Sequence, residues 1–325
     1  MKVTNLNKIQ CSIQNYKNHF KLMTYNIDQA VREEEHAKTK WEVRKNRIKA
    51  LIQEVNADIV CLQELRQLYE DSDPPEVFLG ELSRLGYESF LVRRNPSRMA
   101  FGNAILWKSS RFIATHRDTM WLSDTPWEVS VTESWSPNTW GATVSGVFLQ
   151  SVHERRVIDN VPGFWVWNTH FLLEEKFKFR ACEFLVSYFG GDRRTRNSPW
   201  ILCGDFNFFM PLPNSSEKVF GDEQRKVLTD GGFQDLSKNA QTLGGKTIDG
   251  TFFGYDHDPF KSNLSEMHSR LDHVFGSTYI SVHSAIQYTR SMSDDITFED
   301  DVANELTHRN YPSDHLPQVL ELEVH

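Results

Sequence analysis

Acidic, amide and histidine side chains stand at the ends of short apolar runs along this sequence. The runs KLMTYN (21–26), DIVCLQE (58–64), FWVWNTH (164–170) and PWILCGD (199–205) each have the length of a buried strand. Strand ends on a rigid scaffold present side chains to a common rim. Carboxylates and amides suit a hard divalent cation such as Mg²⁺. We therefore expect one chemical site made of Asn26, Glu64, Asn168, His170, Asp205, Asn207, Asp272, Asp314 and His315.

The segment Gly204-Asp205-Phe206-Asn207 carries the most specific pattern. If the strand continues through it, a period of two places Asp205 and Asn207 on one face, and Gly204 allows a close backbone approach. Asp205 could then orient a water nucleophile or accept its proton, while Asn207 donates to a phosphoryl oxygen. The alternative is an Asx turn that follows the strand. The residues by themselves leave both interpretations open.

The histidines and the other carboxylates also have two interpretations each. His170 could donate to a phosphate oxygen, or it could be a satisfied core or surface residue. Asp272 could fix the tautomer and charge of His315, whereas the alternative for residues 313–315 is an ordinary turn between prolines. Glu64 could bind a metal or cap a strand end. Because every candidate falls at a predicted strand end, we favour the joint chemical interpretation.

The elements that must position these residues can be outlined from periodicity. Apolar residues at i, i+3, i+4 and i+7 between Ile48 and Val55 predict a helix over roughly 41–55. Helical patterns also cover 174–189 and about 76–85, and further strands are predicted at 103–108, 141–150, 271–276, 279–286 and 316–324. Strands outnumber helices, and strict alternation fails in the middle. We predict an α/β sandwich of two packed sheets with helices outside.

Composition narrows the class of protein. With 325 residues, 39% apolar and 25% charged, the chain is globular, which excludes a disordered or fibrous protein. A formal net charge of −8 argues against nonspecific nucleic-acid binding as the main role. The cysteines form no CxxC pair, which fits a reducing compartment. The polar start lacks the pattern of a signal peptide, so we expect a cytoplasmic monomer with a lead-in (1–19) and one domain (20–325).

The ordered set of motifs resembles the endonuclease/exonuclease/phosphatase superfamily, which includes deoxyribonuclease I. The resemblance covers about residues 20–325 and rests on Tyr25-Asn26, Leu62-Gln63-Glu64, Gly102-Asn103-Ala104-Ile105-Leu106, Asn168-Thr169-His170, Gly204-Asp205-Phe206-Asn207, Leu271-Asp272-His273 and Ser313-Asp314-His315. It implies a deoxyribonuclease I-like four-layer α/β sandwich, with two mixed β-sheets flanked by helices. It also implies a phosphoric ester hydrolase that uses Mg²⁺ or Mn²⁺ and water to cleave a phosphomono- or phosphodiester.

The resemblance implies three metal ligands. Glu64 would be the main ligand, Asn26 would stand beside it, and Asp314 would support the metal site. The physical logic agrees, because a cation neutralises the negative charge that spreads over the phosphoryl group in the transition state.

The resemblance also implies five catalytic residues. Asp205 would orient or deprotonate the attacking water, and Asn207 would hold the phosphate. His170 and His315 would face the scissile phosphate, where imidazole donors stabilise developing charge. Asp272 would pair with His315.

A first interpretation of the substrate is a small or lipid-linked phosphoester. An aromatic rim could contact its apolar part, and the candidates are Trp121, Trp127, Trp135, Phe208 and Phe209; the alternative for them is core packing. Four tryptophans fall within 119–141, which has no clear period and reads as a long irregular loop. Inositol phosphates are disfavoured as substrates. The inositol-polyphosphate 5-phosphatases of this superfamily usually carry a Cys-Asp-Arg element, whereas this sequence has Leu271-Asp272-His273.

A second interpretation is a nuclease or an enzyme that processes DNA or RNA ends. The same aromatics could stack bases. Short basic clusters could grip phosphates or simply be solvated, and they comprise Arg93, Arg94 and Arg98, and Arg193, Arg194 and Arg196. A third interpretation is a catalytically inactive binding module, which we disfavour because no expected acidic or histidine position is missing.

Overall fold

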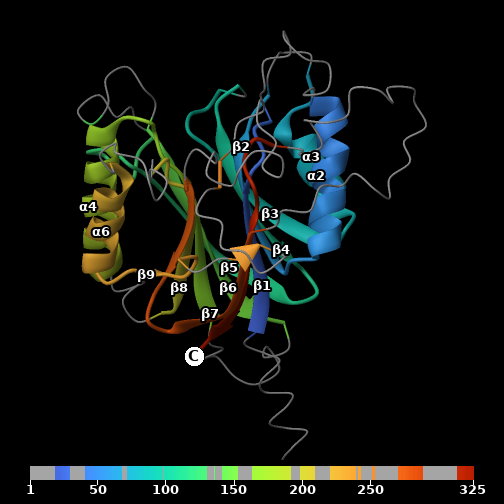
Figure 1. Ribbon diagram of the computed structural model, residues 1–325. Helices are drawn as coiled ribbons and strands as arrows, with labels where there is room; N and C mark the ends of the chain where they lie inside the picture. Colours follow the sequence, from blue (N-terminus) through green and yellow to red (C-terminus); the bar gives the residue numbers. More distant parts are fainter. Residues whose placement is uncertain are drawn as a thin grey trace, which may run out of the picture.

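In the computed structural model, two β-sheets pack face to face and helices cover their outer faces, which gives four layers (Figure 1). The predicted α/β sandwich is thus confirmed. The structure describes residues 19–29, 41–67, 72–97, 99–129, 135, 141–152, 163–191, 198–208, 220–238, 241–242, 251–252, 270–287 and 313–325. The predicted lead-in lies outside this part except for His19, which opens the first strand.

The first sheet has a parallel pair near its centre. In spatial order it consists of β10 (Gln241–Thr242), β12 (Ile280–Gln287), β13 (Gln318–Val324), β1 (His19–Asn26), β2 (Ile59–Leu65), β4 (Gly102–Lys108) and β3 (Tyr87–Arg93). β1 and β2 run parallel, with Asn26 opposite Gln63, while β13 and β4 pair with them antiparallel. The carboxyl ends of β1 and β2 therefore meet at one edge, which carries Asn26 and Glu64.

The second sheet places three predicted site residues in one row. Its order is β5 (Phe112–Trp121), β6 (Thr143–Ser151), β7 (Gly163–His170), β8 (Trp200–Asp205), β11 (Asp272–Gly276) and β9 (Gln234–Asp235). His170 lies opposite Asp205 in the parallel β7–β8 pair, and Asp272 lies opposite Asp205 in the antiparallel β8–β11 pair. Residues in such a row share a face of the sheet.

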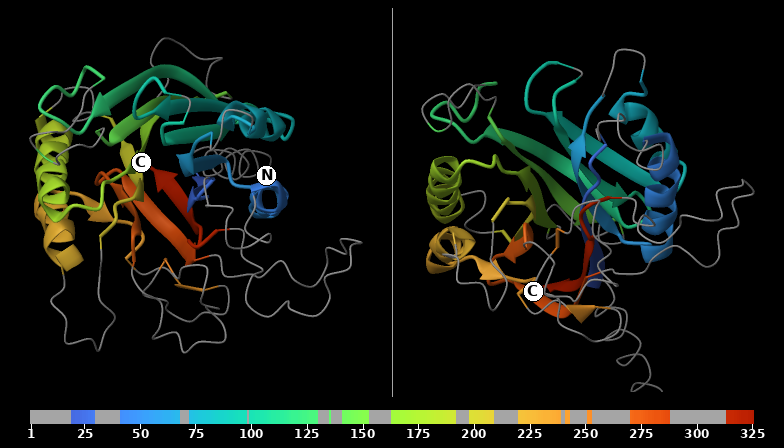
Figure 2. Two further views of the ribbon diagram at one scale, coloured as in Figure 1. Left: turned by 90° about the horizontal axis from the view of Figure 1, so that it is seen from above. Right: turned by 45° about the horizontal axis from the view of Figure 1, so that its top comes forward.

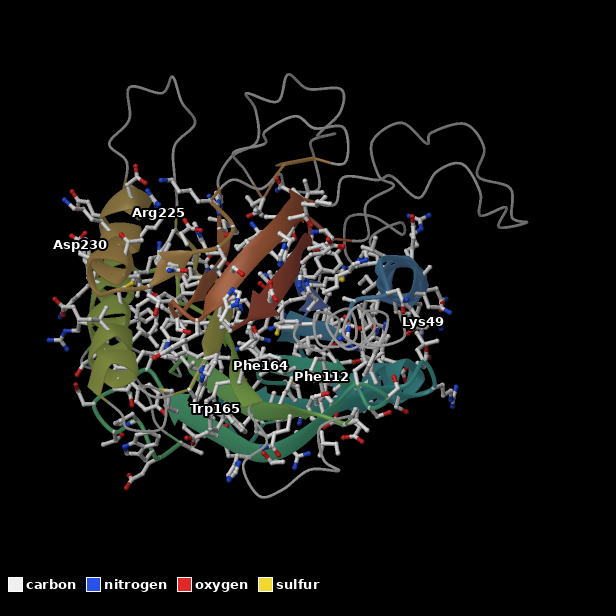
Figure 3. The ribbon with its side chains drawn as sticks, turned by 90° about the horizontal axis from the view of Figure 1, so that it is seen from below. Lys49, Phe112, Phe164, Trp165, Arg225 and Asp230 are labelled. Carbon is white, nitrogen blue, oxygen red and sulfur yellow. The ribbon has the colours of Figure 1, made fainter. Side chains whose placement is uncertain are left out.

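Aromatic side chains fill the space between the sheets. Phe20 stacks on Phe164 with ring centroids 4.8 Å apart, and Phe112 meets Phe164 edge-on at 5.7 Å. Figure 3 shows Phe112 and Phe164 close together in the interior. Close packing of this kind makes the scaffold rigid, so that strand ends hold fixed positions.

Two helices cover each outer face (Figures 1 and 2). Helices α2 (Trp41–Val55) and α3 (Pro75–Ser83) pack on the first sheet, and α4 (Glu175–Gly191) and α6 (Phe220–Asp230) pack on the second. Figure 3 shows Lys49 of α2 and Arg225 of α6 on opposite flanks of the molecule. Lys49 also ties α2 to α3, because its Nζ lies 2.7 Å from Glu81.

Periodicity identified most of these elements and missed a few. The helix predicted over 41–55 coincides with α2, and the predicted strands lie on β1, β2, β4, β6, β7, β8, β11, β12 and β13. The missed strands β3, β5, β9 and β10 are the edge strands of the two sheets, and exposed residues lie along β3 and β5. The missed helix α6 is rich in charged residues. In strand β5 and helix α6, polar and charged residues interrupt the apolar ones, so no apolar run marked them in the sequence.

The stretch 119–141 was expected to be an irregular loop, and that prediction is wrong for part of it. Thr119 to Trp121 belong to β5, and Trp135 is buried in the core between the second sheet and its helices. The indole N–H of Trp135 donates to Asp124 at 2.8 Å. Residues 130–134 and 136–140 lie outside the described part. In the residues that the structure describes, no helix is long and apolar enough to cross a bilayer.

Candidate active site

The side chain of Asn26 connects the two sheets. Its Nδ2 donates to Oε1 of Glu64 at 3.0 Å and to Oδ2 of Asp205 at 2.9 Å, and it lies 3.5 Å from Nε2 of His315. Asn26 and Asp205 are both buried. Carboxylates from the ends of β2 and β8 thus meet an imidazole at one point, as the sequence predicts.

Glu64 reaches this point because its backbone leaves the regular strand. The register between β2 and β4 shifts between Leu62 and Leu65, and Glu64 has φ +62°. Bulges re-aim side chains, and left-handed backbone in a residue with a side chain is strained and collects at functional sites. Asp28 and Asn207, which flank the same site, also have positive φ, at +40° and +52°. No pattern in the sequence indicated this strain.

His170 stands between the carboxylates of the two sheets. Its Nε2 lies 3.7 Å from Oε1 of Glu64 and 3.7 Å from Oδ2 of Asp205. Burial lowers the pKa of His170 well below its usual value, and the charges of Arg94 and His315 lower it further. His170 is therefore neutral at pH 7, and it can donate one hydrogen bond and accept another.

His315 has the opposite electrostatic state. Its Nδ1 pairs with Oδ2 of Asp272 at 2.8 Å, and its Nε2 lies 3.7 Å from Oδ2 of Asp205. Burial lowers the pKa of His315, but the charge and hydrogen bond of Asp272 and the charges of Asp205 and Asp314 outweigh it, and the pKa is raised well above the usual value. Two imidazoles with pKa values pushed apart are suited to different roles.

The carboxyl groups of the site resist ionisation together. Burial and the charge of Asp28 raise the pKa of Glu64 to about 8, against the hydrogen bond from Asn26, and the charge of Asp314 adds to the rise. Burial raises the pKa of Asp205 to about 6 and that of Asp314 to about 6. A cluster of buried carboxylates that repel each other is the environment that a divalent cation relieves.

Asp314 and His315 are held at the end of β1 by the preceding serine. Oγ of Ser313 donates to the carbonyl oxygen of Asn26 at 2.7 Å, and the backbone N–H of His315 donates to Oγ of Ser313 at 3.3 Å. The turn of the alternative interpretation is therefore present, and it brings Asp314 and His315 to the end of β1.

The Gly204–Asn207 segment differs from the expected alternation. β8 ends at Asp205, and the backbone N–H of Asn207 donates to Oδ1 of Asp205 at 2.8 Å, which is the Asx turn of the alternative interpretation. Nδ2 of Asn207 donates to the carbonyl oxygen of Phe171 at 2.9 Å. Gly204 does allow a close approach: at φ +143°, a Cβ there would lie 1.9 Å from the carbonyl oxygen of Thr169.

Asn168 belongs to the scaffold beneath the site. Its Nδ2 donates to the carbonyl oxygens of Leu62 and Ala104, each at 2.9 Å, so that β7 is bonded to two strands of the other sheet. Nε2 of Gln63 donates to Oδ1 of Asn168 at 2.8 Å. These buried hydrogen bonds join β7 to β2 and β4, and so they hold the two sheets together at this point.

The arginine cluster at 93–98 divides into two environments. Nη2 of Arg93 lies 2.7 Å from both carboxylate oxygens of Glu76, so Arg93 is a surface ion-pair partner. Arg94 turns inward, and its Nη2 donates to the carbonyl oxygen of His170 at 3.1 Å. Burial lowers the pKa of Arg94 to about 10, which leaves a fixed positive charge beside the site at pH 7. Outside the described residues lie Arg98, Arg193, Arg194 and Arg196.

Two of the candidates for an aromatic rim belong to the core, which is the alternative interpretation of these residues. Phe208 is fully buried against Phe171, and Trp135 is buried as well. Trp121 is half-buried and its indole N–H donates to the carbonyl oxygen of Arg94 at 2.8 Å, whereas Trp127 is exposed. Phe209 lies outside the described part. Aromatic type alone did not separate core from rim, because both environments favour large rings.

Two residues near the site were not predicted as part of it. Asp28 follows Asn26 by two positions, and its N–H donates to Oδ1 of Asn26 at 3.1 Å. The spacing was a signal that could have found it, since alternate residues after a strand can return to one side. Phe101 packs edge-on against His170 with centroids 6.2 Å apart, and no sequence pattern distinguished it from a core residue.

The two mixed sheets and the buried carboxylate–imidazole cluster define an α/β sandwich of the deoxyribonuclease I type. A family model described as the Endonuclease/Exonuclease/phosphatase family matches residues 23–315. The chain belongs to this family, whose members are hydrolases that act on phosphoesters.

Known proteins resemble the chain in sequence and in fold. An uncharacterized protein, L388 of Acanthamoeba polyphaga mimivirus, is 24% identical over 259 residues, which is 79% of this chain and 87% of that protein. The crystal structure of an endonuclease/exonuclease/phosphatase family protein from Bacteroides thetaiotaomicron has a TM-score of 0.70 at 19% identity and covers 94% of this chain and 98% of its own. The mannosyl-6-phosphatase Bt3783 of Bacteroides thetaiotaomicron VPI-5482 has a TM-score of 0.68 at 21% identity, over 93% and 99% of the two chains.

Proposed function

We propose that the chain is a divalent-metal-dependent phosphoesterase that hydrolyses its substrate by attack of water on phosphorus. The observation that carries the proposal is the contact of Asn26 with both Glu64 and Asp205, beside the His315–Asp272 pair. This arrangement offers a cation site, a carboxylate for water and a cationic donor for phosphate within one buried cluster.

The donor set fits Mg²⁺ or Mn²⁺. Glu64, Asp314 and Asp28 offer the carboxylate oxygens that hard cations prefer. Asn26 would bind through its Oδ1, which accepts the N–H of Asp28 in this structure, while its Nδ2 donates to Glu64. The raised pKa values of Glu64 and Asp314 support this assignment, because a bound cation stabilises their ionised forms. When bound, the ion would supply Lewis-acid polarisation of the phosphoryl group.

The side chains of the second sheet supply the other functions. Asp205 orients the attacking water and accepts its proton, a role that its ionised form plays above a pKa of about 6. His315, kept cationic by Asp272, faces the phosphate and stabilises its developing charge. His170, kept neutral by burial, hydrogen-bonds the same group, and Asn207 holds the phosphate.

The substrate that we propose is a small phosphomonoester. The net charge of −8 disfavours a long polyanion. Arg94, which donates to the carbonyl oxygen of His170, places a local positive charge beside the site that suits a single phosphate group. Phe208 and Trp135 are buried, so these two aromatic rings are not accessible for stacking with nucleic-acid bases. The free, buried state of Cys61, Cys182 and Cys203 supports a reducing compartment, and we propose a cytoplasmic monomer.

The test is a substrate panel with Mg²⁺, in which the Asp205→Asn variant is the control. Sugar phosphates, including mannose 6-phosphate, are compared with nucleotides, single-stranded DNA, RNA and phospholipid headgroups. We expect phosphate release from small monoesters, lost in the variant and after EDTA, and restored by Mg²⁺ or Mn²⁺. Cleavage of oligonucleotides alone would favour the nuclease function, and undiminished activity after exhaustive chelation would exclude metal dependence.

A further inference from the structure

A second group of side chains that could bind a metal ion lies on the first sheet. Nε2 of His19 is 3.2 Å from Oε1 of Glu323, and Nε2 of His283 is 3.0 Å from Oε2 of the same carboxylate. One ligand atom from each residue lies within 4.8 Å of the others. The side chains of His19, His283 and Glu323 are 37%, 44% and 22% exposed, so an ion can reach them from solvent.

Three neighbouring strands supply one residue each. His19 of β1 is the register partner of Glu323 of β13. On the other side of β13, the register of β12 shifts between Val282 and Ser284, which leaves His283 as the extra residue of a bulge. Bulges re-aim side chains and are kept as features with a use. Here the bulge brings the imidazole of His283 to the carboxylate of Glu323.

The three side chains carry donor atoms of the kinds that Zn²⁺ binds. The rings of His19 and His283 lie side by side, with centroids 4.3 Å apart and planes at 33°. Two imidazole nitrogens and one carboxylate oxygen are the donors that Zn²⁺ takes, whereas Mg²⁺ prefers oxygen alone.

A third histidine stands beside the group. Nε2 of His325 lies 2.6 Å from Oγ of Ser281, and Ser281 is the register partner of Glu323 on β12. The backbone N–H of His325 donates to the carbonyl oxygen of Tyr279, which continues the ladder beyond β13. Glu323 and His325 therefore alternate onto the same face. His325 therefore lies on the same face as the group, with its Nε2 hydrogen-bonded to Ser281.

We propose that His19, His283 and Glu323 form a Zn²⁺ site that joins β12, β13 and β1. The site is separate from the candidate active site, because His19 opens β1 and Asn26 closes it. The strand has 8 residues, and its rise over that length separates the two positions by about 23 Å. Figure 1 shows the C-terminus at the end of the molecule where β1 begins, so the ion ties the first described strand to the last. Its role is structural.

The experiment is a calorimetric titration of Zn²⁺ into the full-length chain in excess Mg²⁺, compared between the wild type and matched variants. We expect His283→Ala to bind one Zn²⁺ fewer than the wild type, and Glu323→Gln to bind it at least about 10-fold more weakly. His116→Ala is the control, because His116 is an exposed histidine on β5. It should keep the wild-type stoichiometry.

Thermal unfolding gives a second readout. Without metal, His283→Ala should unfold at the wild-type temperature, because the residue is on the surface. At a Zn²⁺ concentration about 100 times its Kd, the wild type should gain on the order of 5 °C over the variant. Equal stoichiometry and affinity in the wild type and His283→Ala would overturn the proposal, as would an equal loss in His116→Ala. Neither readout depends on phosphoesterase activity, so the test stands even if the proposed catalytic function fails.

Discussion

Nδ2 of Asn26 lies 2.9 Å from Oδ2 of Asp205, although 179 positions separate the two residues in the chain. Asn26 closes β1 in one sheet and Asp205 closes β8 in the other. The packing of the two sheets therefore decides whether the proposed metal ligands Asn26 and Glu64 meet the carboxylate of Asp205. The same amide also contacts Glu64, so a single side chain keeps two carboxylates apart.

Replacing Asn26 should lower the affinity for the metal ion and slow the reaction. Asn26→Ala leaves the carboxylates of Glu64 and Asp205 facing each other without their shared donor. We expect metal affinity to fall about 10- to 100-fold, measured as the Mg²⁺ concentration for half-maximal activity. Asn46→Ala, at an exposed position of α2, should leave that concentration unchanged. An unaltered Mg²⁺ requirement in Asn26→Ala would remove Asn26 from the metal site.

Glu64 should lower the stability of the fold while it supports activity. Its φ of +62° is strained for a residue with a side chain, and glycine adopts it freely. We expect Glu64→Gly to raise the free energy of unfolding by about 1 kcal/mol while activity is lost. Asn56→Gly relieves a similar φ of +51° after α2 and should stabilise without loss of activity. Urea denaturation and Mg²⁺-dependent turnover measure the two effects, and an active Glu64→Gly enzyme would contradict the assignment.

Asp272 should control the pH profile through His315. Its carboxylate, 2.8 Å from Nδ1, is what keeps the pKa of His315 above the usual value despite burial. In Asp272→Asn that pKa falls, so activity that needs the imidazolium is lost at lower pH, and kcat should fall by about 10²-fold. The profile of kcat/KM against pH tests this. Asp73→Asn, on the surface, serves as the control, and an unmoved alkaline limb in Asp272→Asn would disprove the role.

The metal-free protein should lose stability as pH rises. Glu64 has a pKa of about 8 in the fold and 4.5 as its ordinary value, and Asp205 and Asp314 have about 6 against 3.8. Because these pKa values are raised in the fold, the unfolded chain releases the protons at lower pH than the folded chain does. The contribution of the three carboxyl groups to the free energy of unfolding is therefore complete below their ordinary pKa values and is lost by about pH 8. His170, whose pKa is lowered by burial, contributes in the opposite sense, so the comparison is made between variants. In EDTA, we expect the Tm of the wild type to fall relative to that of Glu64→Gln from about pH 5 to about pH 8, and Mg²⁺ to stabilise the wild type more at the higher pH; a Tm difference that rises over this interval would contradict the assignment.

Gly204 should tolerate no side chain. A Cβ at this position would lie 1.9 Å from the carbonyl oxygen of Thr169, at a φ of +143°. We expect Gly204→Ala to cost about 3 kcal/mol or more of the free energy of unfolding, because backbone on β7 would have to move. Gly80→Ala in α3 meets nothing within 4 Å and should stabilise by about 0.5–1 kcal/mol. Chemical denaturation of the pair gives the comparison, and a neutral Gly204→Ala would rule out the tight β7–β8 approach.

The sequence determined the local structure and the identity of the reactive groups. Short apolar runs end at Asn26, Glu64, His170 and Asp205. A strand can be recognised from such a run because the pattern depends only on residues that are neighbours in the sequence. Strand β5 and the charged helix α6 were missed because polar and charged residues interrupt their apolar ones, so no apolar run marked them.

Only the tertiary structure decided how those groups act on one another. Whether His315 is cationic and His170 neutral depends on burial and on partners from other strands, which no local pattern records. The bulges that turn Glu64 and His283 arise from pairing with β4 and β13, so they appear only when the sheet forms. The charge of a buried group and the register of a strand both depend on residues that come together only in the folded chain, so they cannot be read from the sequence alone.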